Sequence, residues 1–197
     1  MTIFQRSAPA APRLCRSFWC SVAQRNWKFR LLPFAIALLI VLADRLSKVL
    51  IQRSVTLFDS ISVVPGWLRI VHTENPGAAF GVLADGNALV RSIVLVGISS
   101  LVLIFVVSAL WNPRSAFASP TTRLGLGLIL GGAIGNLYDR IVYTTVTDFI
   151  EVYHGAWSFP AFNVADSAIT VGAILLLIDL LRSRQKRVDE RPTFAHK

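Results

Sequence analysis

Four long apolar segments divide this chain, at residues 29–51, 88–111, 124–141 and 165–181. Each is long enough to cross about 30 Å of hydrocarbon as a helix. Only 16% of the residues are charged, whereas a soluble domain carries about a quarter. The segments therefore predict a membrane protein of the all-α class, a four-transmembrane-helix bundle. The first segment is expected to be retained, because charged residues follow it instead of a small-residue cleavage site.

The basic residues indicate how this bundle is oriented. They are concentrated in the two tails, 1–28 and 183–197, and the loop 112–123 also carries arginine without an acidic residue. Cytoplasmic loops of membrane proteins are enriched in Lys and Arg. We therefore expect two cytosolic basic tails around a single membrane domain, 29–182, with both termini cytoplasmic. The loops 52–87 and 142–160 should then face outward.

The net charge of +9 could instead suggest a nucleic-acid-binding protein. The positive charge lies just outside the apolar segments, and no recognisable nucleic-acid-binding module accompanies it. We therefore expect no nucleic-acid partner.

The first outward loop contains β-prone runs at 60–64 and 68–72, separated by the turn residues Pro65 and Gly66. Trp67 is amphipathic and suits the headgroup level of a membrane. We expect a small β-rich periplasmic platform against the outer leaflet.

The third apolar segment carries Gly127, Gly131 and Gly135 at four-residue spacing. Small residues at this spacing share one helix face and allow another helix to approach closely. The pattern favours helix packing over a direct chemical role.

Polar residues gather near the outward ends of the segments. A charged side chain at mid-membrane costs at least about 2.5–3.5 kcal/mol, so ionisable residues there are paired, hydrated or functional. With the orientation above, the polar residues of the segments and the second outward loop all fall on one side of the membrane. This layer, our candidate site, contains Asp44, Lys48, Asn136, Asp139, Arg140, Asp148, Asn163 and Asp166.

Carboxylates are the reactive groups of this layer. His72, His154 and His196 lie in two loops and a tail without metal-ligand spacing, so we expect neither a metal nor a cofactor. Two carboxylates held close together share a proton, and such a pair can activate water and polarise a carbonyl group. The pattern predicts hydrolysis but leaves open which two carboxylates act.

Two other classes of function compete with hydrolysis. Intramembrane carboxylates also serve proton relays, so a small proton-coupled transporter is the first alternative. The sequence has no evident inverted repeat or pair of broken helices, which disfavours it. The second alternative is a non-catalytic adaptor that holds a partner helix with the glycine face.

Four sequence blocks resemble those of the lipoprotein signal peptidase (signal peptidase II) family, in the family's order and spacing. They are NPGAAFG at 75–81, GGAIGNLYDR at 131–140, VTDFI at 146–150 and FPAFNVADS at 159–167. The resemblance covers residues 33–182, and four blocks together are highly specific.

The resemblance implies that Asp148 and Asp166 are the catalytic aspartates. It implies supporting or substrate-positioning roles for Asn75, Asn136, Arg140 and Asn163. Asn163 lies three residues before Asp166, so on a helix both should face the same way. Asp44 resembles the aspartate of the family's first span. Asp44 and Lys48 lie one helical turn apart and can form an ion pair, and Asp139 could form a local ion pair with Arg140.

The resemblance also implies the biological setting. The expected partners are diacylglyceryl-modified prolipoprotein substrates, cleaved just before the lipid-modified cysteine, and membrane lipids. The expected location is the bacterial inner membrane, with the active site near the periplasmic face, and we expect a monomer.

The chain departs from the family at two positions near this site. Arg45 stands where the family often has Gln, which bears on contacts near the first helix. Thr144 stands where the family often has Gly, which bears on the loop before Asp148.

Overall fold

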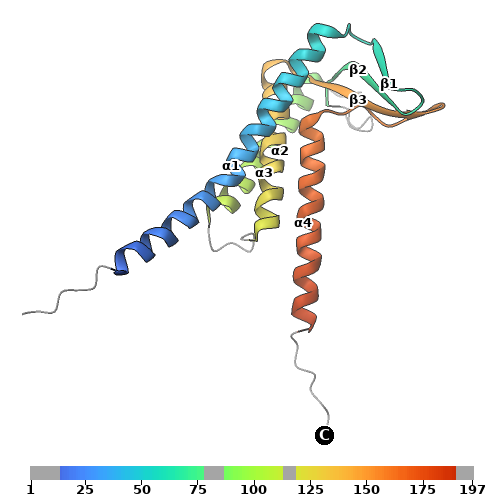
Figure 1. Ribbon diagram of the computed structural model, residues 1–197. Coiled ribbons are helices and arrows are strands. Elements are labelled where there is room, and N and C mark those ends of the chain that lie inside the picture. Colours follow the sequence, from blue (N-terminus) through green and yellow to red (C-terminus); the bar gives the residue numbers. More distant parts are fainter. Residues whose placement is uncertain (1–13, 78–86, 113–118, 190–197) are drawn as a thin grey trace, which may run out of the picture.

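The computed structural model describes residues 14–77, 87–112 and 119–189. In these ranges the chain forms four helices and a small sheet at one end of the helices (Figure 1). The helices are α1 (Leu14–Ser54), α2 (Ala88–Trp111), α3 (Pro120–Val142) and α4 (Val164–Asp189). The strands are β1 (Ser60–Val64), β2 (Leu68–Asn75), β3 (Val146–His154) and β4 (Trp157–Ser158).

Helix α3 contacts each of the other three helices, and its glycines permit the closest approaches. A Cβ atom on Gly131 would lie 2.7 Å from the backbone oxygen of Ala37 in α1. A Cβ atom on Gly132 would lie 2.4 Å from the backbone oxygen of Ala165 in α4. The predicted packing role of the glycine face is therefore confirmed, and α3 uses a second glycine face against α4.

Helices α1 and α3 begin earlier than the predicted spans, because each helix continues beyond its apolar segment. Helix α2 matches its predicted span, 88–111. Helix α1 begins at Leu14, well before residue 29, because the sequence 14–32 contains neither Pro nor Gly to interrupt it. Helix α3 begins at Pro120, four residues early, because the Ser119 hydroxyl caps its first turn by accepting the N–H of Thr122 at 3.1 Å.

Two helices of the described chain are long and apolar enough to cross a membrane: α2, and Val164–Gln185 of α4. In α1 the apolar sequence is interrupted by Asp44, Arg45 and Lys48, and α3 carries several polar residues towards its end. Two of the four predicted membrane spans are thus candidate spans by length and composition, and the count of four stays a prediction.

The sheet is antiparallel, with strand order β1-β2-β3-β4. The predicted β-prone runs form β1 and β2, and β2 continues to Asn75. Strand β3 corrects the sequence analysis, which treated 142–160 as a loop. Its β-branched and aromatic residues suit a strand, and its register places Thr73 opposite Asp148 and Glu74 opposite Thr147.

Candidate active site

Asn163 and Asp166 form a capping box at the start of α4. The Oδ1 atom of Asn163 accepts the backbone N–H of Asp166 at 2.9 Å, and Oδ2 of Asp166 accepts the backbone N–H of Asn163 at 3.2 Å. This reciprocal pairing satisfies N–H groups that have no partner within the helix. We expected the two residues to share a helical face; Asn163 instead precedes the helix and orients Asp166 by capping it.

The same asparagine reaches Asp148 on β3. Because its Oδ1 atom already caps α4, its Nδ2 group is left to donate, and it donates to Oδ1 of Asp148 at 2.7 Å. Asn163 is fully buried and Asp148 is 3% exposed. The two predicted catalytic carboxylates, from a strand and a helix, are therefore brought together on one buried asparagine.

Asn75 holds the other oxygen of Asp148. Its Nδ2 group donates to Oδ2 of Asp148 at 3.0 Å, and its Oδ1 atom accepts the backbone N–H of Gly77 at 2.8 Å. Gly77 has φ +99°, and a Cβ atom there would lie 2.1 Å from Leu95 of α2. A glycine is required at this turn, and the turn fixes which end of the Asn75 amide faces Asp148.

Asn136 of α3 contacts Asp166. Its Nδ2 group donates to Oδ1 of Asp166 at 2.6 Å. Its Oδ1 atom accepts hydrogen bonds from Lys48 at 3.1 Å and from the Asn163 amide at 3.3 Å. Arg140, one turn later, donates to the backbone oxygen of Asn136 at 3.3 Å.

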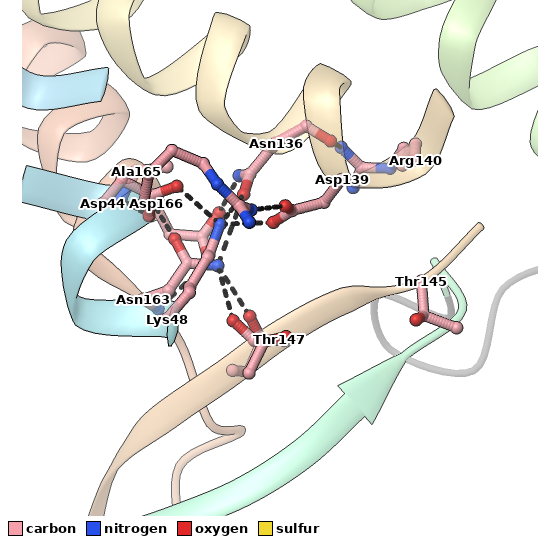
Figure 2. A network of polar contacts seen from close by, with 12 residues as sticks. Asp44, Lys48, Asn136, Asp139, Arg140, Thr145, Thr147, Asn163, Ala165 and Asp166 are labelled. Atoms are coloured by element: carbon pink, nitrogen blue, oxygen red, sulfur yellow. Dashed lines mark hydrogen bonds and ion pairs between the residues drawn. The ribbon is translucent and has the colours of Figure 1, made fainter. Parts of the chain in front are cut away.

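An ion cluster of Asp44, Arg45, Lys48 and Asp139 lies beside these amides. Asp44, Lys48 and Asp139 are buried, and Figure 2 shows them close to Asn136. Lys48 Nζ lies 2.7 Å from Asp44 and 2.6 Å from Asp139, and Arg45 forms a second ion pair with Asp139. Asp44 also accepts the backbone N–H of Ala165 at 3.0 Å, which joins α1 to the start of α4.

These contacts confirm the pairing of Asp44 with Lys48 and correct the local pairing considered for Asp139. Among the described residues, Asp139 forms ion pairs with Arg45 and Lys48 of α1. Arg140 instead donates a hydrogen bond to the backbone oxygen of Asn136. Arg45, which departs from the family pattern, also lies over the rings of Tyr138 at 4.6 Å and Tyr143 at 5.5 Å.

The electrostatic environment distinguishes Asp148. Burial raises the pKa of Asp148 to about 6, and the nearby charge of Asp166 adds to the rise. The hydrogen bonds from Asn75 and Asn163 oppose it. A carboxyl group with this pKa can hold a proton at near-neutral pH, as a general acid must.

A second group of residues, which the sequence analysis missed, anchors β3 to its neighbours. Glu74 accepts the hydroxyl groups of Thr145 at 2.7 Å and Thr147 at 2.9 Å. Gln52, near the end of α1, donates to the Thr147 hydroxyl at 2.8 Å, and His72 lies 3.3 Å from Glu74. We call these five residues the Glu74 cluster. One of its members, Thr147, comes directly before Asp148 on β3.

Comparison with known proteins agrees with this site. The family model described as Signal peptidase (SPase) II matches residues 36–182. A lipoprotein signal peptidase of Solibacter usitatus is 43% identical over 161 residues, which cover 82% of this chain and 94% of that protein. One of Pseudomonas syringae pv. tomato is 41% identical over 154 residues, 76% of this chain and 86% of that protein.

Two solved structures of bacterial membrane enzymes, determined by the in meso method, share the fold. One, at 1.9 Å resolution, has a TM-score of 0.66 and 32% identity, and covers 76% of this chain and 92% of its own. The other, at 2.3 Å resolution, has a TM-score of 0.70 and 30% identity, and covers 82% and 94%.

Proposed function

The chain belongs to the signal peptidase II family, and we propose that Asp148 and Asp166 are the catalytic pair with which it acts. It is an aspartic endopeptidase that processes prolipoproteins, as its curated relatives are lipoprotein signal peptidases. The alternatives, a proton-coupled transporter and an adaptor, have no support among these relatives.

The proposed substrate is a prolipoprotein that already carries diacylglycerol on a cysteine, and the proposed cleavage falls just before that cysteine. Withdrawing an acyl chain from a bilayer costs about 0.8 kcal/mol per CH₂. An enzyme for such a substrate must therefore meet it in the membrane, which suits a site at the end of a helical bundle with exposed apolar side chains such as Leu46 and Leu101.

The observation that carries the assignment is the position of Asn163 between the two carboxylates. Its side-chain amide donates to Asp148 at 2.7 Å, and its backbone N–H donates to Asp166 at 3.2 Å. Two carboxyl groups held by one small residue can flank a single water molecule and share one proton.

The proposed reaction uses one ionised and one protonated carboxyl group. Asp166 lies in the first turn of α4 and accepts two N–H donors, and in this proposal it is the ionised member. It takes a proton from water, whose oxygen attacks the scissile carbonyl carbon, while Asp148 donates its proton to the carbonyl oxygen. As the resulting diol collapses, one of its hydroxyl groups returns a proton to Asp148, the C–N bond breaks, and the amine leaves with a proton from Asp166.

The remaining predicted residues have supporting roles in this proposal. Asn75, Asn136 and Asn163 orient the two carboxylates through the hydrogen bonds described above. Arg140 interacts electrostatically with Asp148 and Asp166. Its guanidinium group can also donate hydrogen bonds to the carbonyl groups of the substrate. The ion cluster joins α1, α3 and the start of α4 beneath them.

We also propose a topology of four spans in the bacterial inner membrane, with the sheet at the periplasmic face. Helix α1 begins and α4 ends at the side of the bundle away from the sheet (Figure 1). This arrangement supports cytosolic tails at 1–28 and 183–197, on either side of a membrane domain 29–182, as the basic residues predict. The proposed working unit is a monomer.

Cleavage of a purified diacylglyceryl-prolipoprotein tests the assignment. Asp148→Asn and Asp166→Asn should each fold, insert into membranes and release no signal peptide. Asp59→Asn is the control, because Asp59 is exposed and contacts Thr56 and Ser60 outside the site; it should cleave like the unaltered protein. Substantial turnover by Asp148→Asn or Asp166→Asn would contradict the proposal.

A further inference from the structure

Lys48 has an unusual position for a lysine: its side chain is 0% exposed, yet its described polar contacts are to Asp44, Asn136 and Asp139 and to neither proposed catalytic carboxylate. We propose that Lys48 is a positioning residue that fixes the Asn136 amide with its N–H group towards Asp166, and so keeps Asp166 the ionised member of the pair. This inference rests on the proposed function.

The two ends of an asparagine side chain differ chemically, because one only donates hydrogen bonds and the other only accepts them. Asn136 directs Nδ2 to Asp166 at 2.6 Å and Oδ1 to Lys48 at 3.1 Å. A reversed amide would turn its oxygen towards the Asp166 carboxylate and its NH₂ group towards the Lys48 ammonium. Both contacts would then be repulsive, so an ammonium at this position selects the observed orientation.

The Asn163 amide lies on the same oxygen of Asn136, at 3.3 Å. Its contact is longer, and its Nδ2 group also donates to Asp148 at 2.7 Å, so it is shared between acceptors. Lys48 is therefore the group that can hold Asn136 independently of the catalytic pair.

The ion cluster provides the buried Lys48 with anionic partners. Asp44 and Asp139 lie within 2.7 Å of its ammonium group, and Arg45 supplies a second cation to Asp139. Two anions and two cations balance, which is the condition for burying charge without a large penalty. Asp44 is placed for this at i,i+4 from Lys48, and its second oxygen holds the N–H of Ala165, the residue before Asp166.

Charged groups approach Asp166 from three elements. Asp148 lies on β3, Arg140 on α3, and the ion cluster spans α1 and α3. Of these groups, Lys48 acts through a defined hydrogen-bonded link, Lys48 to Asn136 to Asp166 (Figure 2). Loss of this link removes a donor from the ionised form of Asp166, so protonation of the pair should begin at higher pH.

A matched set of double variants tests this link without leaving a buried charge unpaired. Lys48→Met/Asp44→Asn removes one cation, one anion and the donor to Asn136, and keeps Arg45 with Asp139. Arg45→Gln/Asp139→Asn, the control, also removes one cation and one anion but keeps Lys48 with Asp44. Lys48→Gln/Asp44→Asn has a neutral N–H donor at position 48. Cleavage of a diacylglyceryl-prolipoprotein is measured from pH 5 to pH 9, with unfolding temperature and folded yield.

For the methionine variant we expect the acid limb of the kcat/KM profile to move about one unit to higher pH, and kcat to fall about tenfold to hundredfold with KM unchanged. The control should keep both limbs in place, and the glutamine variant should largely restore the acid limb. A methionine variant whose unfolding temperature falls while both limbs stay in place would overturn the proposal, because Lys48 would then be structural only.

If the methionine variant does not fold, Lys48→Leu/Asp44→Asn takes its place: an acid limb displaced there and restored in the glutamine variant supports the proposal, and an acid limb kept in place overturns it. The function is tested separately. If Asp148→Asn and Asp166→Asn are inactive while the Lys48 variant without a donor keeps the acid limb, the inference fails and the catalytic pair stands. If either Asp→Asn variant cleaves, the proposed function fails first.

Discussion

Asn75 on β2 donates its side-chain N–H to Asp148 on β3 at 3.0 Å, and the Gly77 turn fixes the direction of that donation. The hydrogen bond stabilises the ionised form of Asp148 and so opposes the effect of burial on its pKa. Asn75 therefore limits how tightly Asp148 holds the proton that the proposed mechanism requires.

Replacing Asn75 should extend activity to higher pH. In Asn75→Ala the pKa of Asp148 rises further, because a donor to the carboxylate is lost. Asp148 then keeps its proton to higher pH, so the alkaline limb of the kcat/KM profile should move up. Asn87→Ala, which removes an exposed helix cap of α2, should leave the limb in place. An alkaline limb that moves down would contradict the proton assignment.

The raised pKa of Asp148 should also make the enzyme less stable as pH rises. The folded protein holds this proton up to about pH 6, whereas an unfolded aspartate loses it near 3.8. Between these values the folded state binds more protons, so protonation stabilises it and stability falls as pH rises through the window. Relative to Asp148→Asn, the unaltered protein should lose about 2–3 kcal/mol between pH 4 and 7. Unfolding in detergent at the two pH values measures this difference, and parallel pH dependences would refute it.

The α1–α3 contact should not tolerate a methyl group at Gly131. A Cβ atom there would lie 2.7 Å from the backbone oxygen of Ala37 and 2.8 Å from Cβ of Ile40. Gly131→Ala should force the helices apart at a cost of about 1–3 kcal/mol or more. Gly97→Ala is the matched control: nothing lies within 4 Å of its Cβ position on α2, and it should gain up to about 1 kcal/mol. Equal unfolding temperatures for the two variants would contradict the packing described.

The Glu74 cluster should hold β3 in the register that presents Asp148. Glu74→Ala removes the acceptor for the Thr145 and Thr147 hydroxyl groups, so amide hydrogen exchange at 146–149 should accelerate and cleavage should slow. Glu151→Ala, on the same strand, removes the partly exposed ion pair with Arg69 and a hydrogen bond with Ser158 of β4, and leaves the Glu74 cluster intact. Such pairs contribute about 0–1 kcal/mol, and exchange at 146–149 should stay unchanged in that variant.

The parts of the fold that depend on local pattern could be predicted from the sequence. The apolar run 88–111 is α2, and the β-prone run 60–64 is β1. The spacing of Gly127 and Gly131 predicted a close helix contact, which α1 makes. Strand β3 was not predicted although its composition carries a β signal, because its pairing partner β2 lies far away in the sequence.

The contacts that define the site could not be predicted, because they join residues far apart in the sequence. Nothing near Lys48 indicates that its ammonium group meets Asn136 and Asp139 of α3. Likewise, three-residue spacing suggested a shared helical face for Asn163 and Asp166, and the capping box appears only once the start of α4 is known. The polar layer was foreseeable as a set of residues, and its hydrogen-bond directions were not.

Single-turnover cleavage by Asp148→Asn, Asp166→Asn and the double variant tests most directly whether the two carboxylates act as one unit. If they share a proton and flank one water molecule, each single variant should fall to the same residual rate and the double variant should be no slower. Losses that multiply in the double variant, or a rate near that of the unaltered enzyme in either single variant, would contradict the account.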